Sequence, residues 1–189
     1  MILDLISNNR SYRRFDEACE ITEVQLRSLI NLARLSASGR NAQPLKYILS
    51  VDRIKNGKIF STLGWAAYLK DWDGPVEGER PSAYIVQLLD TSIGANFFCD
   101  DGIAMQSILL GAVEAGLGGC IFRTINKPTL MELLCIPDQY QIINVIALGK
   151  PIEKVVIDEI KDGDFKYWRD ENGVHHVPKR TVDELVLGL

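Results

Sequence analysis

The chain has 189 residues, a length that suits a single domain covering residues 1–189 with a hydrophobic core of its own. Its formal net charge of −4 gives no general attraction to nucleic acid or to anionic lipid, so neither is expected as a partner. The short apolar start contains Asp4 and has no basic segment before it, so we expect no signal peptide and a cytoplasmic location.

The first half of the chain predicts helices and strands in alternation. Thr22 and Gln25 form a capping box, and Leu26, Leu29 and Ala33 follow at helical spacing. We therefore expect an amphipathic helix that ends in the polar, turn-forming segment 36–44. After it the pattern predicts a strand at 47–51, a helix at 54–69, a loop at 71–81 and a buried strand at 83–89.

The segment 95–115 is apolar on almost all sides, which predicts a central buried helix. Asp100, Asp101, Gln106 and Glu114 would be costly in hydrocarbon, so we do not expect a membrane span. The remaining elements are a glycine turn at 116–119, a strand at 120–122, a helix at 126–134, a strand at 142–148, a hairpin around 170–173 and a final helix capped within 181–184.

The cysteines and histidines give no metal-binding pattern. The cysteines are scattered without a CxxC pair and are expected to be reduced, largely buried thiols; they are Cys19, Cys99, Cys120 and Cys135. The two histidines, His175 and His176, are neighbours whose side chains would point to opposite faces of an extended segment. We therefore expect no shared zinc and no metal site.

Positive charge is concentrated near the start of this acidic chain. Arg10, Arg13 and Arg14 lie within 9–15, with Ser11 between them. Several charge-assisted donors from one short loop suit a phosphate monoester, and Lys179-Arg180 would add to the site if the two ends of the sequence meet. The alternative is a solvated basic patch that pairs with the acidic side chains of 16–20.

Common nucleotide and hydrolase motifs are not present in the sequence. Gly57-Lys58 is followed by Ile59, so there is no Walker A loop, and Gly116–Gly119 leads into a strand instead of a helix. No GxSxG occurs, which disfavours a serine hydrolase. Taken alone, Ser38, Asn41 and Gln43 could be an ordinary helix-terminating loop, and 118–120 a tight turn.

Five short motifs nevertheless occur in a defined order, and together they resemble the flavin-dependent nitroreductase family over nearly the whole chain. They are Arg10-Ser11-Tyr12-Arg13-Arg14-Phe15, Asn41-Ala42-Gln43-Pro44, the segment from Asp101 to Leu110, the turn from Gly116 to Gly119, and Leu148-Gly149-Lys150-Pro151.

The resemblance implies an α+β, three-layer fold in which a mixed central β-sheet is packed by helices, in a homodimer with FMN at its interface. It assigns Arg10, Ser11 and Arg13 to the phosphate and ribityl chain, and Lys179 and Arg180 to the phosphate. Ser38, Asn41 and Gln43 would bond the edge of the isoalloxazine ring, from either subunit. Gly118, Gly119, Cys120 and Ile121 would form a wall beside the ring.

The same resemblance implies a reaction. Hydride would pass from NAD(P)H through flavin N5 to a nitroaromatic, quinone or similar conjugated acceptor, with ping-pong kinetics and no catalytic side chain. Two alternatives stay open: an FMN enzyme with other chemistry, such as reductive dehalogenation, flavin fragmentation or ring dehydrogenation, and a non-catalytic flavin-binding or sensing protein. Arg40 stands where many members have a small residue, and a cation there would favour an anionic substrate or the reduced flavin.

Overall fold

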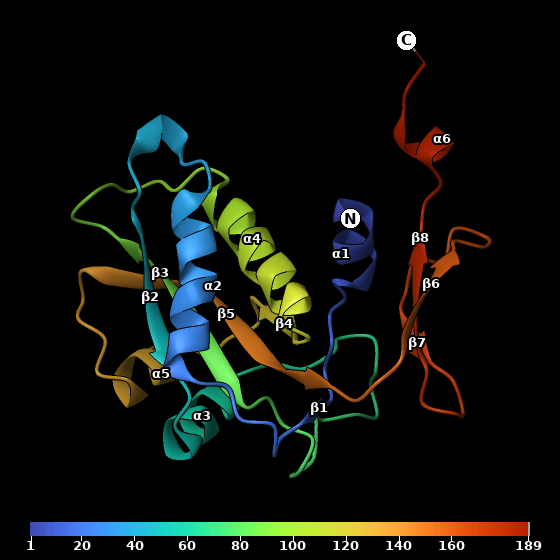
Figure 1. Cartoon of the computed structure of the whole chain (residues 1–189), viewed down its shortest axis with the longest axis horizontal. Coiled ribbons are helices and arrows are strands. Elements are labelled where there is room, and N and C mark those ends of the chain that lie inside the picture. Colours follow the sequence, from blue (N-terminus) through green and yellow to red (C-terminus); the bar gives the residue numbers. More distant parts are fainter. Residues whose placement is uncertain (189) are drawn as a thin grey trace.

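The computed structural model describes residues 1–188. At its centre is a five-stranded sheet in the order β1–β5–β3–β2, with β4 also paired to β5 (Figure 1). Its strands are β1 (Phe15–Asp16), β2 (Leu45–Ser50), β3 (Ala83–Asp90), β4 (Gly118–Phe122) and β5 (Tyr140–Pro151). Every residue of β3 is buried, as its unbroken apolar run predicts for an interior strand.

The pairing within this sheet differs from the expected mixed pattern. β1, β3 and β4 each pair antiparallel with β5, and β2 pairs antiparallel with β3. A parallel contact at the sheet is the isolated bridge between Ser11 and Gly119. The expectation of a mixed sheet therefore needs correction for the strands of residues 1–188, because spatial neighbours alternate in direction: β5 runs opposite to β1, β3 and β4, and β2 runs opposite to β3.

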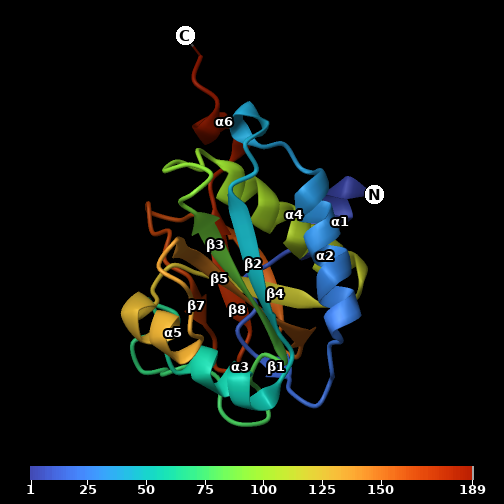
Figure 2. The same ribbon diagram turned by 90° about the vertical axis from the view of Figure 1, so that its left-hand side faces the viewer.

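Helices cover both faces of the central sheet and make three layers (Figure 2). α2 (Glu23–Leu35) and α4 (Asp100–Glu114) pack on one face with Ile85 and Ile146. α3 (Arg53–Phe60) and α5 (Lys127–Leu133) lie on the other, where Val86 and Val145 are buried. Neighbouring strand residues thus point to opposite cores, as the period of two requires. The α+β, three-layer architecture is confirmed.

Two helices have limits that the sequence pattern misplaces. The predicted helix at 54–69 ends at Phe60, because Gly64 N–H donates to the Thr124 carbonyl at 2.9 Å and Trp65 packs edge-on against Phe122. The predicted helix at 95–115 begins only at Asp100, since Phe98 adopts a left-handed backbone with φ of 50°. Tertiary contacts and loop geometry set both limits.

The capping signals are confirmed. Thr22 accepts a hydrogen bond from Gln25 N–H at 3.2 Å, and the Gln25 side chain accepts from Thr22 N–H at 2.8 Å. Thr181 and Glu184 form the same reciprocal pair at the start of α6 (Val182–Leu185). Within residues 1–188, no helix combines the length and apolar character that a bilayer crossing requires.

A second, three-stranded sheet lies apart from the central sheet, beyond the end of β5 (Figure 1). The N-terminal helix α1 (Ile2–Asn8) packs on α4. The strands of the second sheet are β6 (Val155–Glu159), β7 (Trp168–Arg169) and β8 (His175–Lys179), with β8 in the middle. β6 is parallel and β7 antiparallel to β8, so the hairpin around 170–173 is confirmed. His175 is buried next to Tyr167, whereas His176 stacks on Trp168 at 4.1 Å between ring centroids.

Candidate functional site

The segment that carries the three arginines (residues 9–15, the arginine segment) meets the glycine turn (residues 116–119). Ser11 and Gly119 form an isolated parallel bridge there. Tyr12 N–H donates to the Gly119 carbonyl at 3.0 Å. A Cβ at Gly119 would lie 2.7 Å from the Ala147 carbonyl oxygen, and one at Gly118 would lie 2.6 Å from Pro151 Cγ. Both glycines therefore allow close packing against β5, and the bridge from Ser11 to Gly119 joins two of the five motifs at this point.

The three arginines of this segment have different surroundings. Arg10 donates from Nη2 to the Ile6 carbonyl at 2.7 Å, while its buried Nε has no hydrogen-bond partner in residues 1–188. Arg13 is buried, and its guanidinium lies 4.7 Å from the centre of the Tyr167 ring. Arg14 pairs with Glu79. The segment is therefore more than a solvated patch, because Arg13 is buried and one donor of Arg10 is buried without a partner in residues 1–188.

A buried polar cluster holds Arg13 against the C-terminal sheet. Glu153 accepts hydrogen bonds from the N–H groups of Arg13 and Arg14 and pairs with Arg169 at 2.9 Å. Arg13 Nη1 lies 3.1 Å from Nε2 of His175. Burial, and next the nearby Arg13 cation, lower the pKa of His175 to about 4. His175 is therefore neutral at ordinary pH, with Nε2 accepting from Arg13.

Sequence patterns did not identify Glu153 or Arg169, because each is a single charged residue in a charged segment. Their pairing depends on β8 lying next to the arginine segment. The only signal was the general expectation that the two ends of the sequence meet. The hydrogen bond between Arg13 and His175 confirms that meeting.

Lys179 and Arg180 lie at the end of β8 and at the entrance to α6. Arg180 is exposed and approaches Glu184 at 3.4 Å, within the same short helix. The contact that brings the two ends of the sequence together is the one between Arg13 and His175, four residues before this basic pair.

Ser38, Asn41 and Gln43 form one hydrogen-bonded loop. Gln43 N–H donates to Ser38 Oγ at 2.9 Å, and the Gln43 amide donates to Asn41 Oδ1 at 3.2 Å. Asp100 holds this loop, since Ser38 Oγ donates to it at 2.6 Å and Gly39 N–H at 2.8 Å. Asn41 and Gln43 both have positive φ, at 54° and 52°. The loop is therefore fixed on the start of α4, and Asp100 was a missed positioning residue.

The glycine turn and the polar loop lie at opposite ends of α4 (Figure 1). The loop is bonded to Asp100, the first residue of this 15-residue helix, whereas Gly118 follows its last turn. At a rise of 1.5 Å per residue, the helix separates the two by about 22 Å. The predicted site residues of one chain therefore fall into separate groups.

In strand β4, the side chains of the neighbouring residues Cys120 and Ile121 point to opposite faces of the sheet. Cys120 is buried in the core, and burial raises the pKa of its thiol to about 11, so the thiol stays protonated at neutral pH. Ile121 is 38% exposed on the opposite side. The expectation of largely buried thiols holds for Cys120 and is wrong for Cys99 and Cys135, which are exposed.

Comparisons with known proteins point to one family. The sequence model of the nitroreductase family matches residues 90–150, the stretch from the end of β3 to β5. A protein of Archaeoglobus fulgidus named "Putative NADH dehydrogenase/NAD(P)H nitroreductase" is 26% identical over 168 residues, which cover 85% of this chain and 91% of that protein.

Two solved structures show the similarity in three dimensions. A protein of the same name from Parabacteroides distasonis is 27% identical, with a TM-score of 0.65 over 80% of this chain and 88% of that one. An FMN-dependent nitroreductase from Clostridium difficile is 21% identical, with a TM-score of 0.65 and the same coverage. The fold is the nitroreductase fold, and the resemblance to the nitroreductase family is confirmed. These findings support an oxidoreductase of the general flavin-dependent type.

Proposed function

We propose that this chain is an FMN-dependent NAD(P)H oxidoreductase that reduces nitroaromatics, quinones or similar conjugated acceptors. Bound FMN would supply the redox chemistry, taking hydride from the nicotinamide and giving it to the acceptor. The observation that carries the proposal is the bridge between Ser11 and Gly119, because it brings the arginine segment and the glycine turn of the family pattern to one place.

The residues around this bridge fit a phosphate. Arg10 Nε is buried without a partner in residues 1–188, and a buried donor of a cationic group is strongly stabilised by an anion. Ser11 is exposed beside it and can donate from its hydroxyl. We assign Arg10, Ser11 and Arg13 to the phosphate and ribityl chain, with Lys179 and Arg180 approaching from the C-terminal side. Arg13 would act mainly as a fixed positive charge, since His175 and Tyr167 hold its guanidinium.

The wall beside the ring is assigned to Gly118, Gly119, Cys120 and Ile121. Cys120 would contribute only backbone, because its thiol is buried in the core, whereas Ile121 presents an exposed apolar side chain. An apolar surface next to the ring excludes water there and leaves the ring edge for polar contacts.

The polar loop leads us to propose a homodimer. Ser38, Asn41 and Gln43 lie about 22 Å from the glycine turn along α4, too far for both to touch one ring system. In a twofold dimer, the loop of the second subunit would complete the site of the first. Arg40 belongs to the same loop and is exposed, with its guanidinium 5.7 Å from the centre of the Phe98 ring. In the proposed dimer, Arg40 would place a cation near the edge of the isoalloxazine ring.

The visible absorption spectrum of the purified chain tests this function. We expect the protein to carry the yellow colour of a flavin, or to acquire it when incubated with FMN and then desalted. A protein that stays colourless after this treatment would overturn the proposal. The positive control is the same treatment of an FMN-binding relative, and the negative control is heat-unfolded protein.

A further inference from the structure

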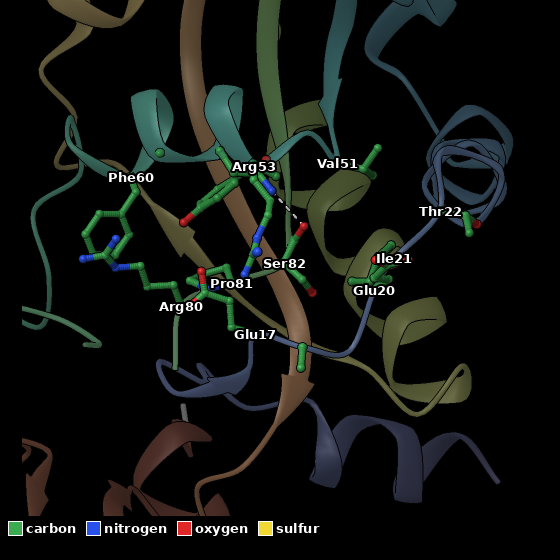
Figure 3. Close-up of a pocket in the computed structure, with 14 residues that line it drawn as sticks. Glu17, Glu20, Ile21, Thr22, Val51, Arg53, Phe60, Arg80, Pro81 and Ser82 are labelled. Atoms are coloured by element: carbon green, nitrogen blue, oxygen red, sulfur yellow. Dashed lines mark hydrogen bonds between the residues drawn. The ribbon is translucent and has the colours of Figure 1, made fainter. Parts of the chain in front are cut away.

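The structure has a cavity of about 580 Å³ that no residue of the glycine turn or of the polar loop lines (Figure 3). It is open to solvent on one side and is bordered by the segment before α2, by α3 and by the start of β3. This volume is within the usual range for small-molecule sites. None of the residues assigned to the flavin lines it. Its lining includes Glu17, Glu20, Arg53, Phe60, Arg80 and Tyr84.

The cavity contains polar groups that the protein itself does not satisfy. Tyr84 is 1% exposed and lines the cavity, yet its hydroxyl has no hydrogen-bond partner in residues 1–188. The same holds for the neighbouring Ser82 Oγ and Arg80 Nε. Buried polar atoms of folded proteins are almost always hydrogen-bonded, so three such atoms on one wall indicate a surface built to receive a ligand.

Charged side chains of both signs line the cavity. Glu17, Glu20, Arg53 and Arg80 all line it, and none of them forms an ion pair with another residue of 1–188. Glu17 accepts a hydrogen bond from Gly78 N–H at 2.6 Å, and the Arg80 guanidinium lies 4.6 Å from the centre of the Phe60 ring. Two carboxylates and two guanidinium groups therefore border one space, with Glu20 and Arg53 on its solvent-exposed side.

A positive and a negative side chain both act on the pKa of the buried Tyr84 hydroxyl. Burial raises the pKa of Tyr84 well above its ordinary value, the Arg80 cation lowers it, and the Glu17 carboxylate raises it. The hydroxyl thus lies within the field of one cation and one anion. A ligand that contacts it can meet both.

We propose that this cavity binds a small zwitterion of the α-amino-acid class, with an apolar side chain. The carboxylate of the ligand would accept from Arg53, Arg80 and Tyr84, and its ammonium would donate to Glu17 or Glu20. Ile21, Val51, Phe60 and Pro81 supply apolar surface for the side chain. A simple anion or a simple cation would satisfy only half of these charges.

Three probes of one shape test this inference by isothermal titration calorimetry on the protein as purified. They are L-phenylalanine, 3-phenylpropanoate, which lacks the ammonium group, and 2-phenylethylamine, which lacks the carboxylate. We expect L-phenylalanine to bind about tenfold more tightly than either relative, since each lacks one charged hydrogen-bonding group. Equal binding of the three, or no binding of L-phenylalanine, would overturn the proposal.

Variants show whether the binding occurs in this cavity. Tyr84→Phe removes an unpartnered hydroxyl, so the variant is expected to fold at least as stably as the parent while L-phenylalanine binds about tenfold more weakly. Arg53→Gln should weaken binding similarly. Lys58→Gln removes a cation from the same helix outside the cavity and should leave the affinity unchanged. If the first two variants retain full affinity, or if FMN competes with L-phenylalanine, the site is elsewhere and the proposal is wrong.

Discussion

Arg13 and His175 are 162 positions apart in the sequence, yet Nη1 of the arginine lies 3.1 Å from Nε2 of the imidazole. This contact ties the segment before β1 to the C-terminal sheet. An arginine can only donate, so Nε2 of His175 must accept, and the imidazole must be neutral. The same contact would be lost if His175 took up a proton.

The protonation of His175 should therefore be visible in stability. Its folded pKa of about 4 lies below the ordinary value of 6.5, so the unfolded chain takes up the proton first as pH falls. The stabilisation is complete above pH 6.5 and is lost as the pH falls toward 4. From this difference in pKa, we expect a free energy of unfolding about 2 kcal/mol lower at pH 5 than at pH 8.

The measurement is urea denaturation at both pH values, on the parent and on His175→Gln. Glutamine keeps an acceptor for Arg13 and does not titrate. The contribution of His175 is the difference in pH dependence between the two proteins, because all other groups titrate in both. An identical pH dependence would show that His175 is not held neutral by its surroundings.

Arg10 and Arg180 are predicted to bind the phosphate of FMN. Replacing either with alanine removes a hydrogen bond to a charged group and should weaken FMN by about ten- to hundredfold. Riboflavin lacks the phosphate, so its affinity should change little. Fluorescence titration with both ligands measures this, with Arg34→Ala on α2 as the matched control. Equal weakening of FMN and riboflavin would contradict the assignment.

Asp100 should determine whether the polar loop is ordered. Its carboxylate accepts from Ser38 Oγ and Gly39 N–H, so Asp100→Ala should lower the free energy of unfolding by about 2–3 kcal/mol. Because the loop is assigned to the ring, FMN and riboflavin should weaken together. Glu114→Ala, at the exposed opposite end of α4, removes the same charge and should change neither property. If Asp100→Ala weakened the binding of FMN but not of riboflavin, the loop would lie at the phosphate instead of the ring.

The glycine turn offers a stability test with an internal comparison. Gly119→Ala would place a Cβ 2.7 Å from the Ala147 carbonyl, an atom of a central strand that cannot move easily. We expect a loss of about 1–3 kcal/mol. Gly102 in α4 has open space around it, so Gly102→Ala should raise the free energy of unfolding by about 0.5–1 kcal/mol. Thermal or urea denaturation of both variants checks this, and equal effects would contradict the packing argument.

The shared site can be tested by mixing two defective subunits. If each site takes Arg10 from one subunit and Gln43 from the other, a heterodimer of Arg10→Ala and Gln43→Ala contains one intact site. Random mixing by co-refolding should then restore about a quarter of the parent's tight FMN sites, because half of the dimers are mixed and half of their sites are intact. No recovery, in a sample that sedimentation shows to be dimeric, would place both residues in one subunit's site.

Local signals in the sequence predicted the elements whose limits are set locally. The reciprocal bonds of Thr22 and Gln25 begin α2, and the apolar run of β3 is buried from end to end. The end of α3 could not be predicted in this way, because Gly64 leaves the helical path to bond Thr124, which lies far along the chain.

The candidate site was predictable to the same extent. The order of five motifs pointed to the arginine segment and the glycine turn, and the structure joins them at Ser11 and Gly119. Asp100 was read only as an acid in a buried helix, since nothing local shows that it holds Ser38. Glu153 was missed for the same reason: its partners Arg13 and Arg169 are brought to it by the fold alone.

The most direct test of the central claim follows the absorbance of bound flavin under anaerobic conditions. The FMN-loaded protein is mixed with NADH or NADPH and then with a quinone or a nitroaromatic. If the chain is an NAD(P)H oxidoreductase, the flavin absorbance should bleach rapidly with at least one of the two nucleotides and return when the acceptor is added. Bound flavin that keeps its absorbance with both nucleotides would contradict this function and indicate a flavin-binding protein without this activity.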